Sequence, residues 1–230
     1  MNDHTIKGFQ RYGSWQPSRT GILLVDPYND FIHPEGKSYY KSKEVIEGVR
    51  LLDHMRTIIT TARELTIQIL YVPHHRAEPT DYTGWKYITA TQLGSRDRQV
   101  FGKGTWGGEF HDDFQPQDND IIIKEHWSQS GFANTDLDMQ LKQHNIDRVI
   151  LIGMLANTCL ESTGRYAMEL GYHVTLVTDA SAAYNWEYMH AAHEINGPTF
   201  AHAILNTEEL TGILRGKPVP TKNAKSISND

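Results

Sequence analysis

The 230-residue sequence contains a single cysteine, Cys159, so no disulfide can form within the chain. So little cysteine is typical of a protein from a reducing compartment. The sequence also lacks any apolar run of the roughly 18 residues that span a membrane, and residues 1–15 contain no apolar segment of the kind found in secretory signals. We therefore expect a cytoplasmic protein with no membrane partner.

An excess of basic charge is also missing. The 28 acidic and 22 basic side chains give a net charge of −6, which provides no attraction for phosphate backbones. We therefore expect no nucleic-acid partner. The hydrophobic fraction of 39% is enough for one sizeable core. It favours a single domain over residues 1–215, followed by a polar tail over 216–230 that we expect to be disordered.

Short apolar, β-branched runs alternate with helical patterns along the chain. Runs of this kind are typical of parallel strands buried on both faces. The alternation predicts a Rossmann-like α/β fold, a three-layer α/β/α sandwich around a six-stranded parallel sheet. The expected strands are residues 21–26, 66–72, 121–124, 148–153, 173–179 and 201–206, and the expected helices are 44–65, 135–144, 158–170 and 184–195.

Residues 73–120 interrupt this alternation, because they are rich in glycine, aromatic and charged side chains. A long irregular segment inside a compact domain is usually a lid or a binding loop. We name it the excursion.

Three predicted strands end in reactive side chains, at the edge where α/β sheets bind ligands. The first ends in Asp26, the third in Lys124, and the fourth leads into the turn that holds Cys159. Each residue taken alone also has a structural interpretation. Asp26 can cap a turn, Lys124 can be a solvated charge, and Cys159 can be a small buried hydrophobe.

The surroundings of Cys159 favour a catalytic role. Thr158 and Glu161 have the spacing of a capping box, which predicts that a helix begins at Thr158 and that the thiol lies in its first turn. Free backbone N–H groups there favour a thiolate and can stabilise an oxyanion. Because Asp26 favours the thiol instead, we expect the resting enzyme near balance between a protonated Cys159 and a form in which the proton has moved to Asp26.

Three motifs carry a resemblance to a known family. They are the segment from Gly153 to Gly171 around Cys159, the run Asp26-Pro-Tyr-Asn-Asp-Phe31, and Ile123-Lys124 followed by Ser130-Gly-Phe132. Together the motifs resemble those of the isochorismatase-like hydrolase superfamily, over about residues 21–206. Its members include nicotinamidases, N-carbamoylsarcosine amidohydrolases, ureidoacrylate and biuret hydrolases, and isochorismatase.

The resemblance implies a catalytic triad of Asp26, Lys124 and Cys159. It also implies a cis peptide between Met154 and Leu155, with the N–H groups of Leu155 and Cys159 forming an oxyanion hole. No cofactor is implied, and the family pattern predicts a homodimer or homotetramer.

Substrate and metal sites are less clearly marked. Trp127, Phe132 and Trp106 are candidate walls of a substrate pocket, and Tyr28 stands where the family often has glutamine. Metal-binding nicotinamidases have Asp-x-His after the second strand, whereas this chain has Pro73-His74-His75. We therefore expect no metal, with His74 or His75 as the alternative, and we disfavour nicotinamide as substrate.

These features predict a cysteine-dependent hydrolase that cleaves the C–N bond of a small amide, ureido or carbamoyl compound through a thioester. Two alternatives remain. Hydrolysis of the vinyl ether of isochorismate requires no thiol nucleophile, so Cys159 argues against it. A catalytically inactive binding protein on the same fold would not need the reactive side chains at three strand ends.

Overall fold

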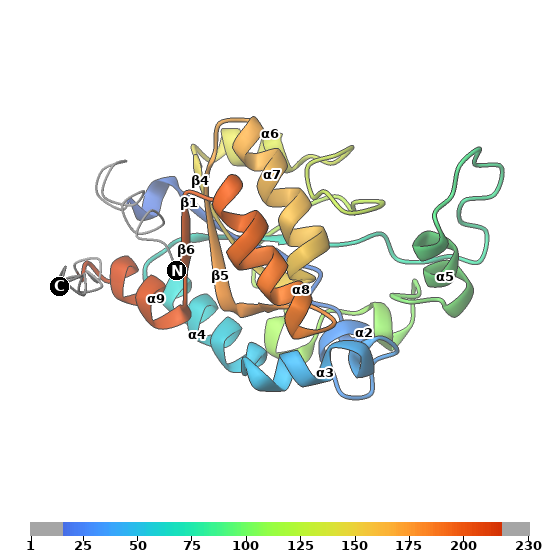
Figure 1. Ribbon diagram of the computed structural model, residues 1–230. Helices are drawn as coiled ribbons and strands as arrows, with labels where there is room; N and C mark the ends of the chain where they lie inside the picture. Colours follow the sequence, from blue (N-terminus) through green and yellow to red (C-terminus); the bar gives the residue numbers. More distant parts are fainter. Residues whose placement is uncertain (1–15, 218–230) are drawn as a thin grey trace, which may run out of the picture.

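The computed structural model describes residues 16–217 (Figure 1). The predicted disordered tail, residues 216–230, therefore lies almost entirely outside the described residues, as does the beginning of the predicted domain.

The sheet has six strands, all parallel, in the order β3-β2-β1-β4-β5-β6. The predicted α/β/α fold class is confirmed. Side chains of β1 alternate between two cores, because Ile22 and Leu24 pack on one side of the sheet while Leu23 and Val25 pack on the other. The strands are β1 (Thr20–Val25), β2 (Gln68–Val72), β3 (Ile121–Ile122), β4 (Arg148–Met154), β5 (His173–Ala182) and β6 (Ala203–Leu205).

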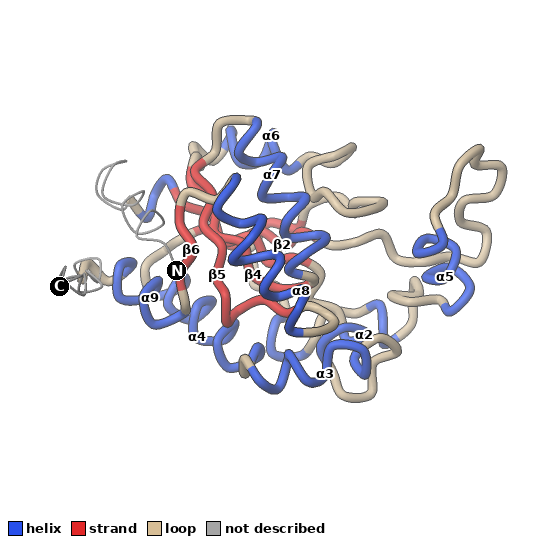
Figure 2. Tube along the Cα trace, viewed as in Figure 1, coloured by secondary structure: helices blue, strands red, loops and turns tan. Residues whose placement is uncertain are grey.

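Helices cover both faces of the sheet (Figures 1 and 2). One core contains side chains of α3, α4 and α9, and the other contains side chains of α6 and α7. The helices are α2 (Asn29–Ile32), α3 (Tyr39–Gly48), α4 (Leu51–Glu64), α5 (Ala90–Arg98), α6 (Leu137–Gln143), α7 (Glu161–Glu169), α8 (Trp186–His190) and α9 (Thr207–Leu214).

The helix predicted over residues 44–65 is two helices. The chain breaks between α3 and α4 at Arg50, whose φ of 53° is in the left-handed region. The Arg50 guanidinium then pairs with Asp53 in the first turn of α4. Apolar spacing continues across the break, which is why periodicity alone predicted one helix.

Hydrogen bonds to the segment that follows β1 hold the excursion against the rest of the protein. Asp30, almost completely buried, accepts hydrogen bonds from the backbone N–H of Phe101 and of Lys37. The Asn29 side chain donates to the carbonyl of Trp106 at 2.9 Å. Asn29 and Asp30 therefore position the excursion, whose helix α5 projects to one side of the molecule (Figure 1).

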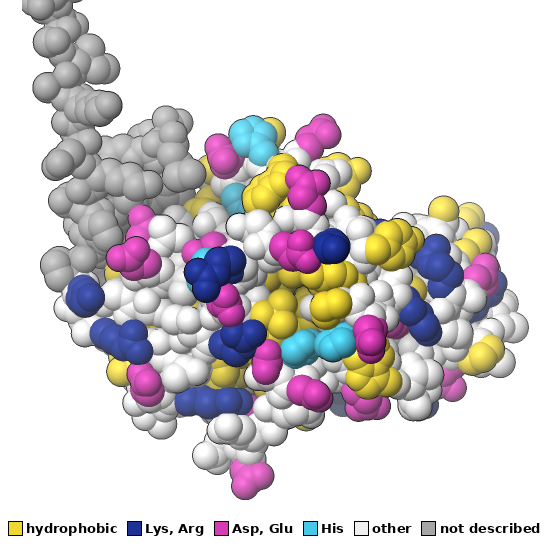
Figure 3. Space-filling model, turned by 90° about the horizontal axis from the view of Figure 1, so that it is seen from below, with side chains coloured by type: hydrophobic (Ala, Val, Ile, Leu, Met, Phe, Trp, Pro, Cys, Tyr) yellow, Lys and Arg dark blue, Asp and Glu magenta, His cyan; other side chains and the backbone are white. Residues whose placement is uncertain are grey.

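No helix within residues 16–217 is long and apolar enough to cross a membrane. On the face seen from below, acidic and basic side chains are interspersed with hydrophobic ones (Figure 3). No region of a single charge dominates that face.

Gly153, near the end of β4, allows the close contact between β4 and β1. Its φ is +115°, and a Cβ at this position would lie 2.1 Å from the carbonyl oxygen of Val25. We expect Gly153→Ala to destabilise the protein by about 3 kcal/mol or more, because backbone strain and overlap add together. Gly171→Ala is the matched control, since Gly171 has a φ of +90° with nothing within 4 Å of a Cβ. Urea unfolding measures both variants, and equal losses would contradict the steric argument.

Candidate active site

Asp26 follows β1 and lies at the carboxyl edge of the sheet. Its φ of 51° is left-handed, and its N–H donates to the carbonyl of Val72 on the neighbouring strand. Aspartate tolerates this conformation better than most residues. The side chain is completely buried, so the carboxylate faces the protein interior.

Cys159 lies in a helical turn directly after β4. The turn, Ala156–Leu160, leads into α7, and the peptide bond before it, Met154–Leu155, is cis, as the resemblance implies. The predicted capping box is wrong, because Leu155 is the N-cap and Thr158 is already inside the helix. The Thr158 hydroxyl instead lies 3.8 Å from the Cys159 sulfur.

His126 is the residue that reaches Asp26 from the third strand. Its Nε2 lies 3.1 Å from Asp26 Oδ1, and both side chains are fully buried. One ring nitrogen of His126, one carboxylate oxygen of Asp26 and the sulfur of Cys159 lie within 4.8 Å of one another. The structure thus brings together two of the three predicted residues and adds one that the sequence analysis missed.

Lys124, predicted as the third member, is exposed, so that prediction is wrong. The cause is a bulge after β3. The N–H of Ile123 donates to the carbonyl of Tyr71, and the N–H of His126 donates to the carbonyl of Pro73. Between these two hydrogen bonds the chain advances two residues after β2 but three residues after β3. The extra residue redirects the side chains, as bulges near active sites often do. The backbone N–H of Lys124 pairs with Asp136.

The hydrogen bonds of His126 define the protons that the site holds. Nδ1 lies 3.2 Å from the carbonyl oxygen of Ser128, which can only accept, so Nδ1 carries a proton. The contact between Nε2 and Asp26 Oδ1 then requires a second proton, held by either partner. The pair is therefore an imidazolium with a carboxylate, or a neutral imidazole with a carboxylic acid.

The surroundings of Cys159 favour the protonated thiol. Burial raises its pKa well above the usual range, and the charge of Asp26 raises it further, while Thr158 and the Leu155 N–H act in the opposite direction. The expected balance with a proton-transferred form did not include the desolvation of the sulfur, which favours the protonated thiol. Deprotonation must accompany attack on the substrate.

The aromatic side chains predicted to line the pocket lie in different surroundings. Tyr28 and Phe132 are buried in the two cores, where Tyr28 stacks on Phe101 and Phe132 stacks on Tyr166. Their contact with a substrate stays a prediction. Trp106 and Trp127 are both partly exposed.

Tyr184, which the sequence analysis did not single out, lies near the thiol. Burial raises the pKa of Tyr184, and the electrostatic effect of Cys159 adds to it. Tyr184 follows β5, which is not one of the three strands that supply Asp26, His126 and Cys159, so strand-end reasoning gave no reason to select it.

Trp127 belongs to a cluster that we name the His75 clamp: His75, Asp81, Glu125 and Trp127. The His75 ring stacks on Trp127 with centroids 3.7 Å apart. Its Nε2 lies 2.9 Å from Asp81 and its Nδ1 lies 3.2 Å from Glu125. Because a carboxylate lies at hydrogen-bonding distance from each ring nitrogen, these contacts favour the imidazolium form of His75. The backbone N–H of His75 also donates to the carbonyl of His126, so the clamp adjoins the site.

The clamp predicts a pH-dependent contribution to stability. Burial acts to lower the pKa of His75, but its hydrogen bonds to Glu125 and Asp81 outweigh burial and raise the pKa above its usual value. The stabilisation is therefore present at and below the usual histidine pKa and is lost as pH rises through the folded pKa.

We expect His75→Gln to cost about 2 kcal/mol at pH 6 and less at pH 9, measured by urea unfolding. His190→Gln is the control, because His190 and its partner Glu194 are both largely exposed. A cost for His75→Gln that does not change with pH would contradict a charged clamp.

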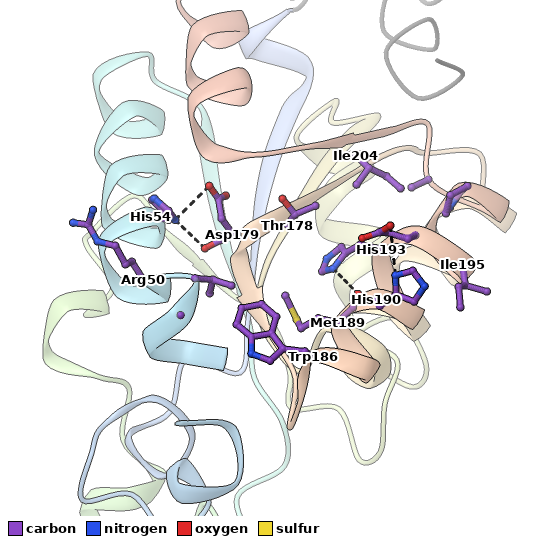
Figure 4. A pocket seen from close by; sticks show the side chains of 15 residues that line it. Arg50, His54, Thr178, Asp179, Trp186, Met189, His190, His193, Ile195 and Ile204 are labelled. Carbon is purple, nitrogen blue, oxygen red and sulfur yellow. Dashed lines mark hydrogen bonds and ion pairs between the residues drawn. The ribbon is translucent and has the colours of Figure 1, made fainter. Parts of the chain in front are cut away.

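A separate pocket of about 1120 Å³ lies between α4, β5 and the α8 region (Figure 4). Two of its histidines are already paired. His54 Nδ1 lies 3.4 Å from Asp179 Oδ2, and His193 Nε2 lies 3.1 Å from the hydroxyl of Ser181. Neither Asp26 nor Cys159 lines this pocket, so it is not the site described above.

The fold and the site thus define a doubly wound α/β protein with a buried aspartate, histidine and cysteine at the carboxyl edge of its sheet. The family model described as Isochorismatase domain matches residues 20–208, and the chain belongs to this family. The resemblance found in the sequence motifs is confirmed.

Known proteins similar to the chain agree with this assignment. The chain is 27% identical to the ureidoacrylate amidohydrolase RutB of Pantoea ananatis, over 85% of this chain and 78% of the relative. A cysteine hydrolase from Pseudomonas syringae pv. phaseolicola superposes with a TM-score of 0.75 at 21% identity, over 88% and 95% of the two chains. The N-carbamoylsarcosine amidase of Thermoplasma acidophilum has a TM-score of 0.63 at 26% identity, over 83% and 98%.

Proposed function

We propose that the protein is a cysteine-dependent amidohydrolase that acts on a small amide, ureido or carbamoyl compound. The observation that supports this most strongly is the buried cluster of Asp26, His126 and Cys159, with donor atoms within 4.8 Å of one another. It places a thiol beside a base and a partner for that base, which is the arrangement that activates a weak nucleophile.

The first half of the reaction transfers the acyl group to sulfur. The Cys159 thiol gives its proton to Asp26 as the sulfur attacks the carbonyl carbon. The resulting oxyanion accepts hydrogen bonds from the N–H groups of Leu155 and Cys159. Asp26 then returns the proton to the leaving nitrogen, and ammonia or an amine departs to leave a thioester.

The second half restores the enzyme. Asp26 takes a proton from water, the water oxygen attacks the thioester, and the sulfur leaves as a thiolate that regains the proton from Asp26. His126 Nε2, which lies 3.1 Å from Asp26 Oδ1, can hydrogen-bond the carboxyl group of Asp26 as that group gains and loses the proton. We assign to His126 the electrostatic role first predicted for Lys124.

The similar proteins support the class of substrate. Two of them are named for C–N hydrolysis, of ureidoacrylate and of N-carbamoylsarcosine. We infer that this chain also hydrolyses a non-peptide C–N bond. The homodimer or homotetramer expected from the family stays a prediction.

Ammonia release tests the proposal directly. Purified protein is assayed against a panel of primary amides, carbamoyl amino acids and ureido acids, with Cys159→Ala as the blank. We expect release from at least one class of compound that the blank does not catalyse. Pyruvate release from isochorismate with no ammonia from any amide would favour vinyl-ether hydrolysis, and no turnover at all would favour a binding protein.

A further inference from the structure

We propose that Asp26, His126 and Cys159 also form an inhibitory site for a soft divalent cation such as Zn²⁺. They offer a carboxylate oxygen, an imidazole nitrogen and a sulfur, a set of donors that suits zinc. All three side chains are buried, and their donor atoms lie within 4.8 Å of one another. Three protein ligands leave a fourth position open for water.

The geometry requires only a small adjustment. Zinc bonds of about 2.0–2.3 Å in a tetrahedral site place donor atoms about 3.3–3.8 Å apart. The contact between His126 and Asp26 is already 3.1 Å. Because that contact is already short, the remaining closure brings the Cys159 sulfur toward these two groups.

Two further observations point to a ligand between these groups. Asp26 Oδ2 is buried and has no hydrogen-bond partner of good geometry among residues 16–217. His126 Nδ1 donates to the carbonyl of Ser128, which fixes the ring so that Nε2 faces the other two donors. A backbone carbonyl on the second nitrogen is the usual support of a histidine that binds a metal.

Binding must release protons. The thiol loses one proton, and the hydrogen bond between Asp26 and His126 loses another, because Nε2 must be free to bind the cation. We expect about two protons to be released for each cation at neutral pH. Affinity should rise with pH, because binding releases protons.

The consequence is inhibition. A cation on the sulfur blocks the nucleophile and also occupies the base that would receive its proton. Chelation should therefore leave activity unchanged or raise it. A hydrolase that uses a metal-bound water would instead lose activity on chelation.

Cobalt titration of the metal-free full-length protein tests the site without measuring turnover. Co²⁺ on a thiolate gives a charge-transfer absorbance in the near ultraviolet, and we expect this signal to saturate at one equivalent. Cys159→Ser should abolish the signal. His126→Ala should weaken affinity more than about 100-fold, because even loss of a residue that only orients a ligand costs about 10–100-fold. Calorimetry in two buffers counts the released protons.

His190→Gln and Lys124→Ala are the matched controls, because both residues are exposed and lie outside the cluster. Cobalt that binds without the absorbance, or equally well to Cys159→Ser, would overturn the proposal. Turnover that requires the cation would also overturn it and favour metal-dependent hydrolysis. If cobalt binds as described but no amide is hydrolysed, the metal site stands and the proposed function fails.

Discussion

Cys159→Ala and Asp26→Asn are each expected to reduce kcat by at least about 1,000-fold while leaving the protein folded. The sulfur supplies the bond to the acyl group, and Asp26 moves the proton without which a thiol with a raised pKa cannot attack. Because both variants remove one shared step, the double variant should be about as slow as either single variant. Initial rates on the best amide of the panel measure all three.

Circular dichroism and urea unfolding provide the control for folding in this series. Both substitutions keep the approximate size of the side chain and remove its charge or its thiol. A Cys159→Ala protein that retained a tenth of the activity would contradict the nucleophile. A double variant much slower than either single variant would show that the two residues act in separate steps.

His126→Ala is expected to reduce kcat/KM by about 100-fold or more, because it leaves the fully buried carboxyl group of Asp26 without its partner at 3.1 Å. His126→Lys should recover part of this loss, since an ammonium can replace the imidazolium. A lysine keeps its charge to higher pH than a histidine. A pH–rate profile of His126→Lys that differs from that of wild type is the readout that a packing role alone would not give.

Lys124→Ala separates the structural assignment from the one suggested by the sequence. Lys124 is exposed and two residues from His126, so we expect activity within about twofold of wild type. If Lys124→Ala were inactive and His126→Ala active, the assignment of His126 would be wrong. A pH profile unchanged by His126→Lys would leave His126 with a packing role only.

The sequence predicted the parts of the site that depend on regular structure. Asp26 and Cys159 follow long, fully buried strands, so an apolar run and its end were enough to place both at one edge of the sheet. The family motifs added the Met154–Leu155 cis peptide, which no local pattern indicates.

What could not be predicted depends on backbone irregularity and on tertiary contacts. One extra residue after β3 brings His126, in place of Glu125, opposite His74, and a bulge leaves no mark in the composition. The break at Arg50 is hidden for a similar reason, since an arginine in the left-handed region is uncommon. Tyr28 and Phe132 have the aromatic character of pocket residues, and only the packing reveals that both are core.

The most direct test of the central claim is the partition of the acyl group between water and hydroxylamine. Substrates that share one acyl group but release different amines are hydrolysed in the presence of hydroxylamine, and the acid and hydroxamate products are measured by mass spectrometry. A thioester on Cys159 predicts one hydroxamate-to-acid ratio for all leaving groups, because every substrate passes through the same acyl-enzyme. A ratio that changes with the leaving amine, or hydrolysis without hydroxamate, would contradict covalent catalysis by Cys159.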